Sequence, residues 1–322
     1  MTHQRFLKVW QLRALILSIS VAMAGYLAIS LWGGWEEVAT AFMQVGIAGT
    51  ALALALSLVN YGLRFLRWQL YLDRQGHTIP WPTSLRIYLS GFALTTTPGK
   101  TGEAFRGVLL KPHGVPYPAT FAAFISERLS DLIAIVLLTL FGLAHYPQAR
   151  GIVLVGMLGI MVALACLSSK TLLTTLHRYG TTRRGKLMRL LAQLSEVLLR
   201  ARRCQRPALL VVTTLVSLVA WFAEALAFYW VLGWLGADVT LAFACFVYAL
   251  AMLAGALSFL PGGLGSAEAV MVSLLVISGM TTPAAVAATI FIRLATLWFA
   301  VAIGLVCLMR SRHGEPRTEG SA

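Results

Sequence analysis

Charged side chains inside otherwise apolar segments are the first residues whose chemistry the sequence singles out. Glu127, Arg128 and Asp131 lie within a turn of one another in one apolar segment, and Arg293 lies in another. A charge inside a membrane costs about 3 kcal/mol or more, so such residues are functional candidates by default. The planar guanidinium group of arginine binds phosphate through two parallel hydrogen bonds. Arg128 and Arg293 therefore predict a site for a phosphate-bearing headgroup.

Two proline–glycine turns interrupt the apolar segments. The turns contain these residues: Pro98, Gly99 and Gly102 in the first, and Pro261, Gly262, Gly263 and Gly265 in the second. Irregular backbone at membrane depth survives only where protein or a wet cavity covers it. A helix that restarts after each turn presents free N–H groups and a positive dipole end, which favour anions. Each turn is therefore predicted to lie beside a polar cavity.

Acidic residues follow both turns at the same relative position. Glu103 and Glu268 are expected in the first turn of the restarting helices, where each could cap free N–H groups or pair with Arg128 and Arg293. Such pairs could lock each turn to the next helix, and this structural role is compatible with headgroup binding. Lys100 extends the predicted anion-binding surface on the cytoplasmic side.

Three further charges are assigned from their positions. Arg106 joins Lys100 in the predicted cytoplasmic funnel, and Arg64 and Glu224 join Glu127 and Asp131 in a predicted charge network. The cysteines and histidines are unclustered, so neither a disulfide framework, a metal site nor a bound cofactor is expected.

The elements that must position these residues are membrane helices. Among 322 residues, 58% are hydrophobic and 12% are charged, whereas soluble domains carry about 25% charged residues. The net charge of +14 comes from basic residues between apolar runs, where they act as orientation signals. Because no nucleic-acid-binding motif accompanies them, nucleic acid is excluded as a partner.

The apolar pattern predicts an all-α polytopic fold in a single transmembrane domain, residues 1–322. Six full spans are expected at 12–31, 44–63, 118–143, 150–167, 208–232 and 283–309. Basic residues place both termini, 64–83 and 168–207 in the cytoplasm. Re-entrant helical hairpins are then expected at 84–111 from the cytoplasm and at 241–279 from outside, although 241–260 is long enough to span. Ala22, Met23 and Ala24 resemble a signal-peptidase site, but the apolar run continues beyond them, so the first span is expected to be retained.

An internal repeat supports this arrangement. Residues 103–132 align with 268–297 without gaps, and Ser57 falls opposite Ser217 with Arg64 opposite Glu224. The aligned identities include Glu103/Glu268, Gly114/Gly279, Pro118/Pro283 and Arg128/Arg293. The repeats are predicted to cover about 12–143 and 150–309 in opposite orientations, which is typical of transporters.

A basic segment, 170–207, separates the first two spans of the second repeat. Leu187, Leu190, Leu191, Leu194 and Leu198 recur there at helical spacing. This pattern predicts an amphipathic helix that binds an anionic lipid surface through 183–206. A solvated linker helix is the alternative.

Three segments together resemble the lysylphosphatidylglycerol synthase transmembrane (flippase-like) family. They are Thr97 to Glu103 (TPGKTGE), Ser126 to Asp131 (SERLSD) and Leu260 to Glu268 (LPGGLGSAE). The resemblance covers about residues 10–310. It implies an inner-membrane protein that moves a lipid across the bilayer, without identifying the lipid. The aminoacyl-transferase domain of the bifunctional members has no counterpart here, so lipid synthesis is not expected.

Three functions follow from these features. The first is a translocator of an anionic or zwitterionic lipid that binds between the two hairpins. The second, an enzyme acting on lipid, is disfavoured because no nucleophile–base pair or metal cluster is evident. The third is a non-transporting scaffold for envelope-lipid biosynthesis enzymes, with the basic helix as its docking face. The sequence does not specify an oligomeric state.

Overall fold

The computed structural model describes residues 35–97, 101–144, 146–182 and 185–313. All regular elements in these residues are helical, as predicted. The α-helices are α2 (Trp35–Arg74), α3 (Trp81–Ser90), α4 (Arg106–Leu110), α5 (Tyr117–Leu143), α6 (Arg150–Ser168), α7 (Lys170–Thr182), α8 (Lys186–Cys204), α9 (Pro207–Trp234), α10 (Leu241–Leu257), α11 (Ser266–Ile277), α12 (Thr282–Arg293) and α13 (Phe299–His313). The predicted span 12–31, with its signal-peptidase-like residues, and Pro98, Gly99 and Lys100 of the first turn lie outside the described residues.

Four described helical segments are long and apolar enough to cross a membrane: Val38–Arg74, Arg150–Ser168, Pro207–Trp234 and Thr282–Arg310. Helix α6 shows what surrounds them, because Leu154, Leu158 and Met161 are more than 60% exposed. The interior, by contrast, holds Arg67 and Glu127 without any exposure. Apolar side chains outside and charges inside are the distribution expected of a protein that is solvated by lipid.

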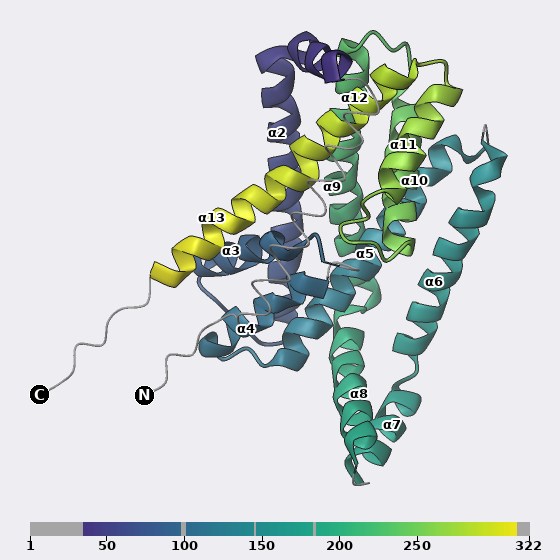
Figure 1. Ribbon diagram of the computed structural model, residues 1–322. Helices are drawn as coiled ribbons and strands as arrows, with labels where there is room; N and C mark the ends of the chain where they lie inside the picture. The colour runs from purple at the N-terminus through teal and green to yellow at the C-terminus, as the bar shows by residue number, and fades with distance from the viewer. Residues whose placement is uncertain (1–34, 98–100, 145, 183–184, 314–322) are drawn as a thin grey trace, which may run out of the picture.

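Helices α2 and α9 lie side by side through the middle of the bundle (Figure 1). Small polar residues allow this close approach, because Ser57 and Ser217 are both fully buried. The amide Nδ2 of Asn60 also donates to the carbonyl of Ala220 across the pair, at 2.8 Å. Helix α5 packs against both α9 and α10, so it lies at the junction between the two halves.

The second proline–glycine turn joins α10 to α11 as an antiparallel pair. Gly262, Gly263 and Gly265 have φ angles of 63°, 70° and 86°. This left-handed region is costly for residues with a Cβ, so glycine is required at these positions. A Cβ at Gly263 would also lie 2.9 Å from the Cα of Gly255, so the turn is folded tightly onto α10.

The first predicted hairpin contains less regular helix than expected. Helix α3 continues into a 3-10 turn, η1 (Gly91–Leu94), and the chain returns through a second 3-10 turn, η2 (Thr101–Phe105), and the five-residue α4. The returning half of the predicted hairpin is therefore divided between 3-10 turns and one short α-helix. Helix α13 packs against α3 and η1 and covers this region (Figure 1).

Residues 64–83 are predicted to be cytoplasmic from their basic side chains, but the first half of this segment is helical and packs inside the bundle. Helix α2 is kinked at Gly46, near the start of the predicted span, and then continues without a break to Arg74. Arg64 and Arg67 are 5% and 0% exposed, so neither lies in water. Their sequence position resembled an orientation signal, but carboxylates from α5 neutralise them inside the bundle.

The basic segment 170–207 is also organised differently from the prediction of one amphipathic helix. Helices α7 and α8 pack against each other as an antiparallel pair that extends beyond the bundle (Figure 1). A Cβ at Gly180 would lie 2.7 Å from the backbone nitrogen of Ala192, which shows how closely they cross. This packing covers part of the α8 surface, but the side chains of Leu187, Leu190 and Leu194 remain at least half exposed.

We expect Gly304→Ala to destabilise the packing of α13 on η1. A Cβ at Gly304 would lie 2.2 Å from the backbone nitrogen of Ala93, and backbone atoms cannot yield as a flexible side chain can. Overpacking of this kind typically costs about 1–3 kcal/mol. The thermal midpoint of purified protein in detergent should fall. Gly62→Ala is the matched control, because a Cβ there meets nothing within 4 Å, and an equal fall in both variants would contradict the packing argument.

Candidate functional site

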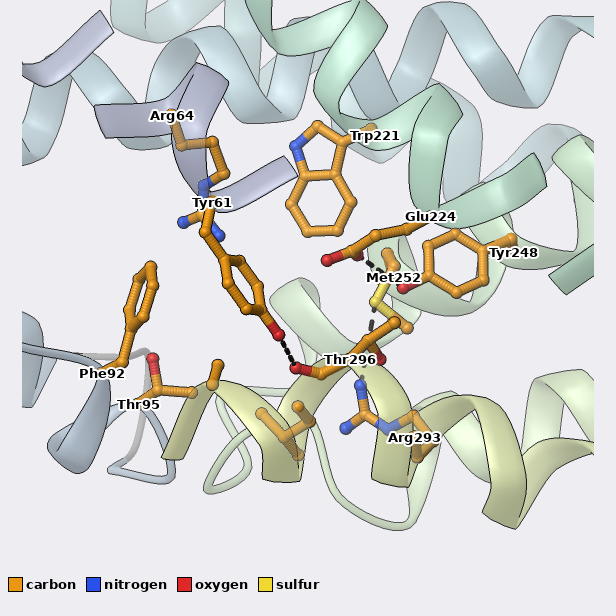
Figure 2. Close-up of a pocket in the computed structure, with 12 residues that line it drawn as sticks. Tyr61, Arg64, Phe92, Thr95, Trp221, Glu224, Tyr248, Met252, Arg293 and Thr296 are labelled. Carbon is orange, nitrogen blue, oxygen red and sulfur yellow. Dashed lines mark hydrogen bonds between the residues drawn. The ribbon is translucent and has the colours of Figure 1, made fainter. Parts of the chain in front are cut away.

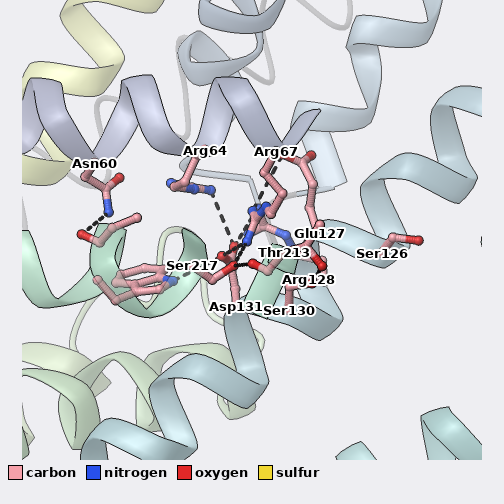
Figure 3. A network of polar contacts seen from close by, with 12 residues as sticks. Asn60, Arg64, Arg67, Ser126, Glu127, Arg128, Ser130, Asp131, Thr213 and Ser217 are labelled. Atoms are coloured by element: carbon pink, nitrogen blue, oxygen red, sulfur yellow. Dashed lines mark hydrogen bonds and ion pairs between the residues drawn. The ribbon is translucent and has the colours of Figure 1, made fainter. Parts of the chain in front are cut away.

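Seven ionised side chains gather around the middle of α5 and form what we term the buried charge cluster. Its members are Arg64, Arg67, Glu103, Arg106, Glu127, Arg128 and Asp131. The arginines come from α2, α4 and α5, and the carboxylates come from η2 and α5. Figure 3 shows Arg64 and Arg67 of α2 directed toward Asp131. The structure thus brings together Arg64, Glu127 and Asp131 of the predicted charge network, whereas the fourth predicted member, Glu224, lines a cavity between the two halves of the chain.

Arg67 lies at the centre of the cluster. Its Nη1 is 2.6 Å from Oδ1 of Asp131 and also donates to the hydroxyl of Ser217. Its Nη2 lies 3.7 Å from Oε1 of Glu127. Trp221 of α9 donates to the same Asp131 oxygen at 3.1 Å. Arg67 therefore ties α2, α5 and α9 together through charge-assisted hydrogen bonds.

Arg106 is part of this packed cluster rather than an open funnel. Its two terminal nitrogens each lie 2.8 Å from a carboxylate oxygen, one of Glu103 and one of Glu127. Its guanidinium lies 5.0 Å from the ring centroid of Trp68 and 4.3 Å from that of Tyr88, within cation–π range. Because its side chain is 1% exposed, we assign Arg106 to holding the first hairpin against α5.

Arg128 is the most accessible arginine of the cluster, with a side chain that is 26% exposed. Its Nη2 lies 3.4 Å from Glu103 and 3.3 Å from Asp131. The predicted pairing of Arg128 with Asp131 on one face of α5 is therefore present. A partly exposed guanidinium with two long ion-pair distances retains donors that a ligand could engage.

Arg293 makes the corresponding contacts in the second half. Its Nε donates to Oε1 of Glu268 at 2.6 Å, and its Nη2 donates to the carbonyl of Gly262 at 2.9 Å. Both predicted Glu–Arg pairs, Glu103–Arg128 and Glu268–Arg293, are thus formed. The second pair fixes the proline–glycine turn to α12, because Arg293 contacts the turn itself.

The start of α11 after Gly265 is capped by Glu268, which is one of the two roles predicted for this residue, so the backbone N–H of Gly265 is not free for an anion. Oε2 of Glu268 accepts a hydrogen bond from the backbone nitrogen of Gly265 at 2.6 Å. The carboxylate therefore caps the start of α11 while it also pairs with Arg293. In the first hairpin, the corresponding element is a 3-10 turn followed by a helix too short to carry a substantial dipole.

A small cavity, which we term the interhelical cavity, lies between the two halves. Its walls are Tyr61, Arg64, Phe92, Thr95, Trp221, Glu224, Tyr248, Met252, Arg293, Thr296, Leu297 and Ala300. Figure 2 shows Arg64 of α2, Glu224 of α9 and Arg293 of α12 converging on it. Its volume is about 40 Å³, which accommodates a few water molecules but no lipid headgroup. In this structure the cavity is therefore closed to a lipid headgroup.

Arg64 places an incompletely satisfied guanidinium in the cavity wall. Neither its Nε nor its Nη2 has a hydrogen-bond partner within the described part of the chain. Nη2 lies 3.6 Å from Asp131 as an ion pair, and the rings of Phe92 and Trp221 lie 5.8 and 5.7 Å from the guanidinium carbon. A buried donor without an acceptor is costly, so this position favours an additional acceptor from water or a ligand.

Glu224 supplies the carboxylate of the cavity. Its Oε2 accepts a hydrogen bond from the hydroxyl of Tyr248 at 2.6 Å. Tyr61 donates to the carbonyl of Thr296 on the opposite wall. Thr296 belongs to a π-helical turn, η5 (Leu294–Trp298), that joins α12 to α13 and directly follows Arg293. Such turns are frequent at functional sites because they disturb the regular backbone ladder.

Several site residues were not predicted from sequence. Arg67 was counted among the basic residues flanking a span, and Tyr61, Trp221 and Tyr248 look like ordinary apolar-segment aromatics. The alignment of Arg64 with Glu224 was the signal that locates the cavity, because both residues line it. Pro98, Gly99 and Lys100 lie outside the described residues, so their predicted roles remain predictions.

Metal chemistry has little support in the described part of the chain. No group of three or more His, Cys, Asp or Glu side chains suited to hold a metal ion is found there. The carboxylates of the charge cluster are each engaged by arginine.

Comparison with known proteins agrees with the architecture. The sequence profile of the lysylphosphatidylglycerol synthase transmembrane region matches residues 14–304. A UPF0104 membrane protein of Pyrococcus horikoshii is 22% identical over 92% of this chain and 97% of its own length. Two UPF0104 membrane proteins of Methanothermobacter thermautotrophicus are 23% and 24% identical, over 90% and 87% of this chain and 93% and 88% of their own lengths.

Proposed function

This multi-pass membrane protein belongs to the family of the lysylphosphatidylglycerol synthase transmembrane region, and we propose that it is a flippase-like translocator of lipids with anionic or zwitterionic headgroups. The headgroup crosses through the interhelical cavity while the acyl chains remain in the bilayer. Arg293 binds the phosphate from the cavity wall, and Arg128 engages it at the partly exposed edge of the charge cluster. The reaction is transfer without covalent chemistry.

One observation carries the proposal. Arginines and a carboxylate from both halves of the chain meet in a cavity inside a bundle whose outer surface is apolar. A merely structural ion pair does not require a wet cavity, since buried charges are most stable when they are directly and fully paired. A transporter does require polar groups that converge at the interface of its two halves.

The proposed topology is six spans and two re-entrant hairpins in two inverted repeats, in the inner membrane with both termini cytoplasmic. The two Glu–Arg pairs support it, because Glu103–Arg128 and Glu268–Arg293 join equivalent positions of the aligned repeats. The lengths of α10 and α11 also support it. They contain 17 and 12 residues, so each rises at most about 26 Å against a hydrocarbon core of about 30 Å.

The closed cavity implies that transport requires a conformational change. The second turn contacts the end of the segment before the first turn at the edge of the cavity, since a Cβ built on Gly262 would lie 3.6 Å from the Cα of Thr96 and 3.6 Å from Cδ2 of Leu297 in η5. Separation of these turns would enlarge the cavity. The π-helical turn η5 lies beside the contact and is the described element best suited to yield, because its backbone hydrogen-bonding is already irregular.

The proposal is tested by reconstitution. Purified protein is placed in vesicles of phosphatidylethanolamine and phosphatidylglycerol that contain a trace of acyl-labelled fluorescent phosphatidylglycerol. The label exposed in the outer leaflet is then destroyed by a membrane-impermeant reductant. Protein-containing vesicles should lose more than the half of the signal that protein-free vesicles lose. If vesicles with and without the protein lost the same fraction of the signal for each of several phosphate-bearing lipid probes, lipid transfer would be overturned as the function.

The scaffold function keeps one specific observation in its favour. Leu187, Leu190 and Leu194 form an exposed apolar row on α8, beside Lys186 and Arg189. This surface fits either an anionic leaflet or an envelope-lipid enzyme. Deletion of 186–194 discriminates the functions: a scaffold would lose its effect on lipid composition in cells but show unchanged transfer in vesicles that lack partner proteins. A translocator that needs this segment for membrane contact should lose transfer in the vesicles as well, to the same extent as it loses its effect on lipid composition in cells.

A further inference from the structure

The charges of the two halves are unbalanced in opposite senses. The buried charge cluster contains four arginines and three carboxylates. Around the cavity in the second half, one arginine, Arg293, accompanies two carboxylates, Glu224 and Glu268. Arg64 is the member of the buried charge cluster that lines the cavity, and Glu224 is the carboxylate of the second half that lines it. These two residues occupy equivalent positions of the repeat, so the same place carries opposite charges in the two halves.

We propose that Glu224 is the resident counter-anion of an Arg64–Arg293 anion site and that it takes up one proton when a phosphate-bearing headgroup binds. This inference rests on the proposed function and specifies how the same site is coupled. The phosphate replaces the carboxylate as the negative partner of the two guanidinium groups. The proton comes from water on the side to which the cavity is open, and it returns to water when the phosphate leaves. One proton thus accompanies each headgroup.

The electrostatic reason is the low dielectric of the bundle interior. With Glu224 ionised, the positive charges of the buried charge cluster and Arg293 equal the negative charges of the cluster, Glu224 and Glu268. Entry of a phosphate monoanion would add an uncompensated negative charge, and such a charge costs several kcal/mol when it is taken out of water. Protonation of Glu224 removes one negative charge as the phosphate supplies one, so the net charge of the cavity is the same before and after binding.

All titratable groups that line the cavity fit this assignment. Arg64 and Tyr61 face it from α2, Tyr248 from α10 and Arg293 from α12, and Glu224 is the one carboxylate among the lining residues. The hydroxyl of Tyr248, which donates to Glu224 at 2.6 Å, can remain the donor to the second carboxyl oxygen or accept from the protonated form. Trp221 and Phe92 keep the guanidinium of Arg64 shielded on both flanks.

The test measures proton uptake on binding rather than transfer. Titration calorimetry of the detergent-purified protein with dihexanoyl phosphatidylglycerol is performed in buffers of different ionisation enthalpy. Wild-type protein should take up close to one proton per bound lipid above the titration range of Glu224. Its affinity should fall about tenfold for each unit of rising pH there, as linkage to one proton requires. Glu224→Gln, which keeps an acceptor for Tyr248, should bind without proton uptake and without this pH dependence.

Glu196→Gln is the matched control, because Glu196 lies on α8 beside Arg200 and away from the cavity; it should behave as wild type. Proton uptake by Glu224→Gln equal to that of wild type would overturn the inference. So would wild-type binding without proton uptake, or no binding of the probe by a folded wild-type protein. Normal binding and uptake with no transfer in vesicles would instead refute the translocator function and leave the counter-anion assignment intact.

Discussion

Arg67→Ala is expected to lower the stability of the protein by about 3–5 kcal/mol, the largest effect on folding of any single substitution considered. The reason is that Arg67 is fully buried and shared by Asp131 and Glu127. Its removal leaves Asp131 inside the bundle without its closest cation and takes a second cation from Glu127, and breaking a buried pair on one side typically costs this much. The thermal midpoint of the detergent-solubilised protein and its yield of monodisperse material should both fall steeply.

Two controls separate this charge effect from loss of packing. Arg200→Ala removes a partner from the Arg200–Glu196 pair, which is 3.0 Å long but has side chains that are 27% and 38% exposed. An exposed pair of this kind contributes about 1 kcal/mol or less. The double variant Arg67→Met, Asp131→Leu removes both charges from the centre and should recover part of the lost stability. If Arg67→Ala were no worse than Arg200→Ala, the buried charge cluster would not hold the bundle together.

The largest expected effect on function is that of Arg293→Ala, which should reduce lipid transfer about ten- to a hundredfold. This range corresponds to the loss of one charge-assisted hydrogen bond of about 1.5–3 kcal/mol to the headgroup phosphate. Arg128→Ala should have a smaller effect, because Arg128 lies outside the lining of the closed cavity. Arg293→Lys should be intermediate, since it keeps the charge but loses the bidentate geometry.

The measurement is the initial rate of transfer in vesicles, normalised to the amount of folded protein. Arg310→Ala is the matched control, because Arg310 is an exposed arginine near the end of α13 and should leave the rate unchanged. Folding of Arg293→Ala must be confirmed by its thermal midpoint, since Glu268 loses its cation and the turn at Gly262 loses a donor. A folded Arg293→Ala protein with wild-type transfer would refute the arginine as a headgroup ligand.

Much of the architecture was accessible from sequence because membrane insertion imposes strong rules. Apolar run length predicted the helices that became α2, α5, α6 and α9, and proline and glycine placed the turn before α11. The alignment of the repeats predicted that Glu103 pairs with Arg128 and that Glu268 pairs with Arg293. Each pair joins an acid and a base that are 25 residues apart, and both this equal separation and the chemical complementarity are visible in the residue order.

What could not be predicted depends on contacts between distant segments. Arg64 and Arg67 follow an apolar run just as an orientation signal does, and only the carboxylates of α5 show that they are buried. Likewise, the sequence of 170–207 has the periodicity of one amphipathic helix, whereas Gly180 allows α7 and α8 to pack closely. The π-helical turn after Arg293 has no sequence signal, because it arises from how α12 and α13 pack around the cavity.

The passage of lipid through the interhelical cavity is tested most directly by joining the two halves covalently at the edge of this cavity. Thr96→Cys in the first half and Leu297→Cys in η5 of the second half place thiols on opposite sides of the Gly262 contact, because the Cα of Thr96 and the Cδ2 of Leu297 each lie 3.6 Å from a Cβ built on Gly262. They are introduced into protein whose four native cysteines, Cys166, Cys204, Cys245 and Cys307, are replaced by alanine. Transfer should stop when mass spectrometry shows the disulfide formed, and it should resume on reduction, while each single cysteine variant remains active under both conditions. If fully cross-linked protein transferred lipid as fast as the same protein with free thiols, a route through the interhelical cavity would be contradicted.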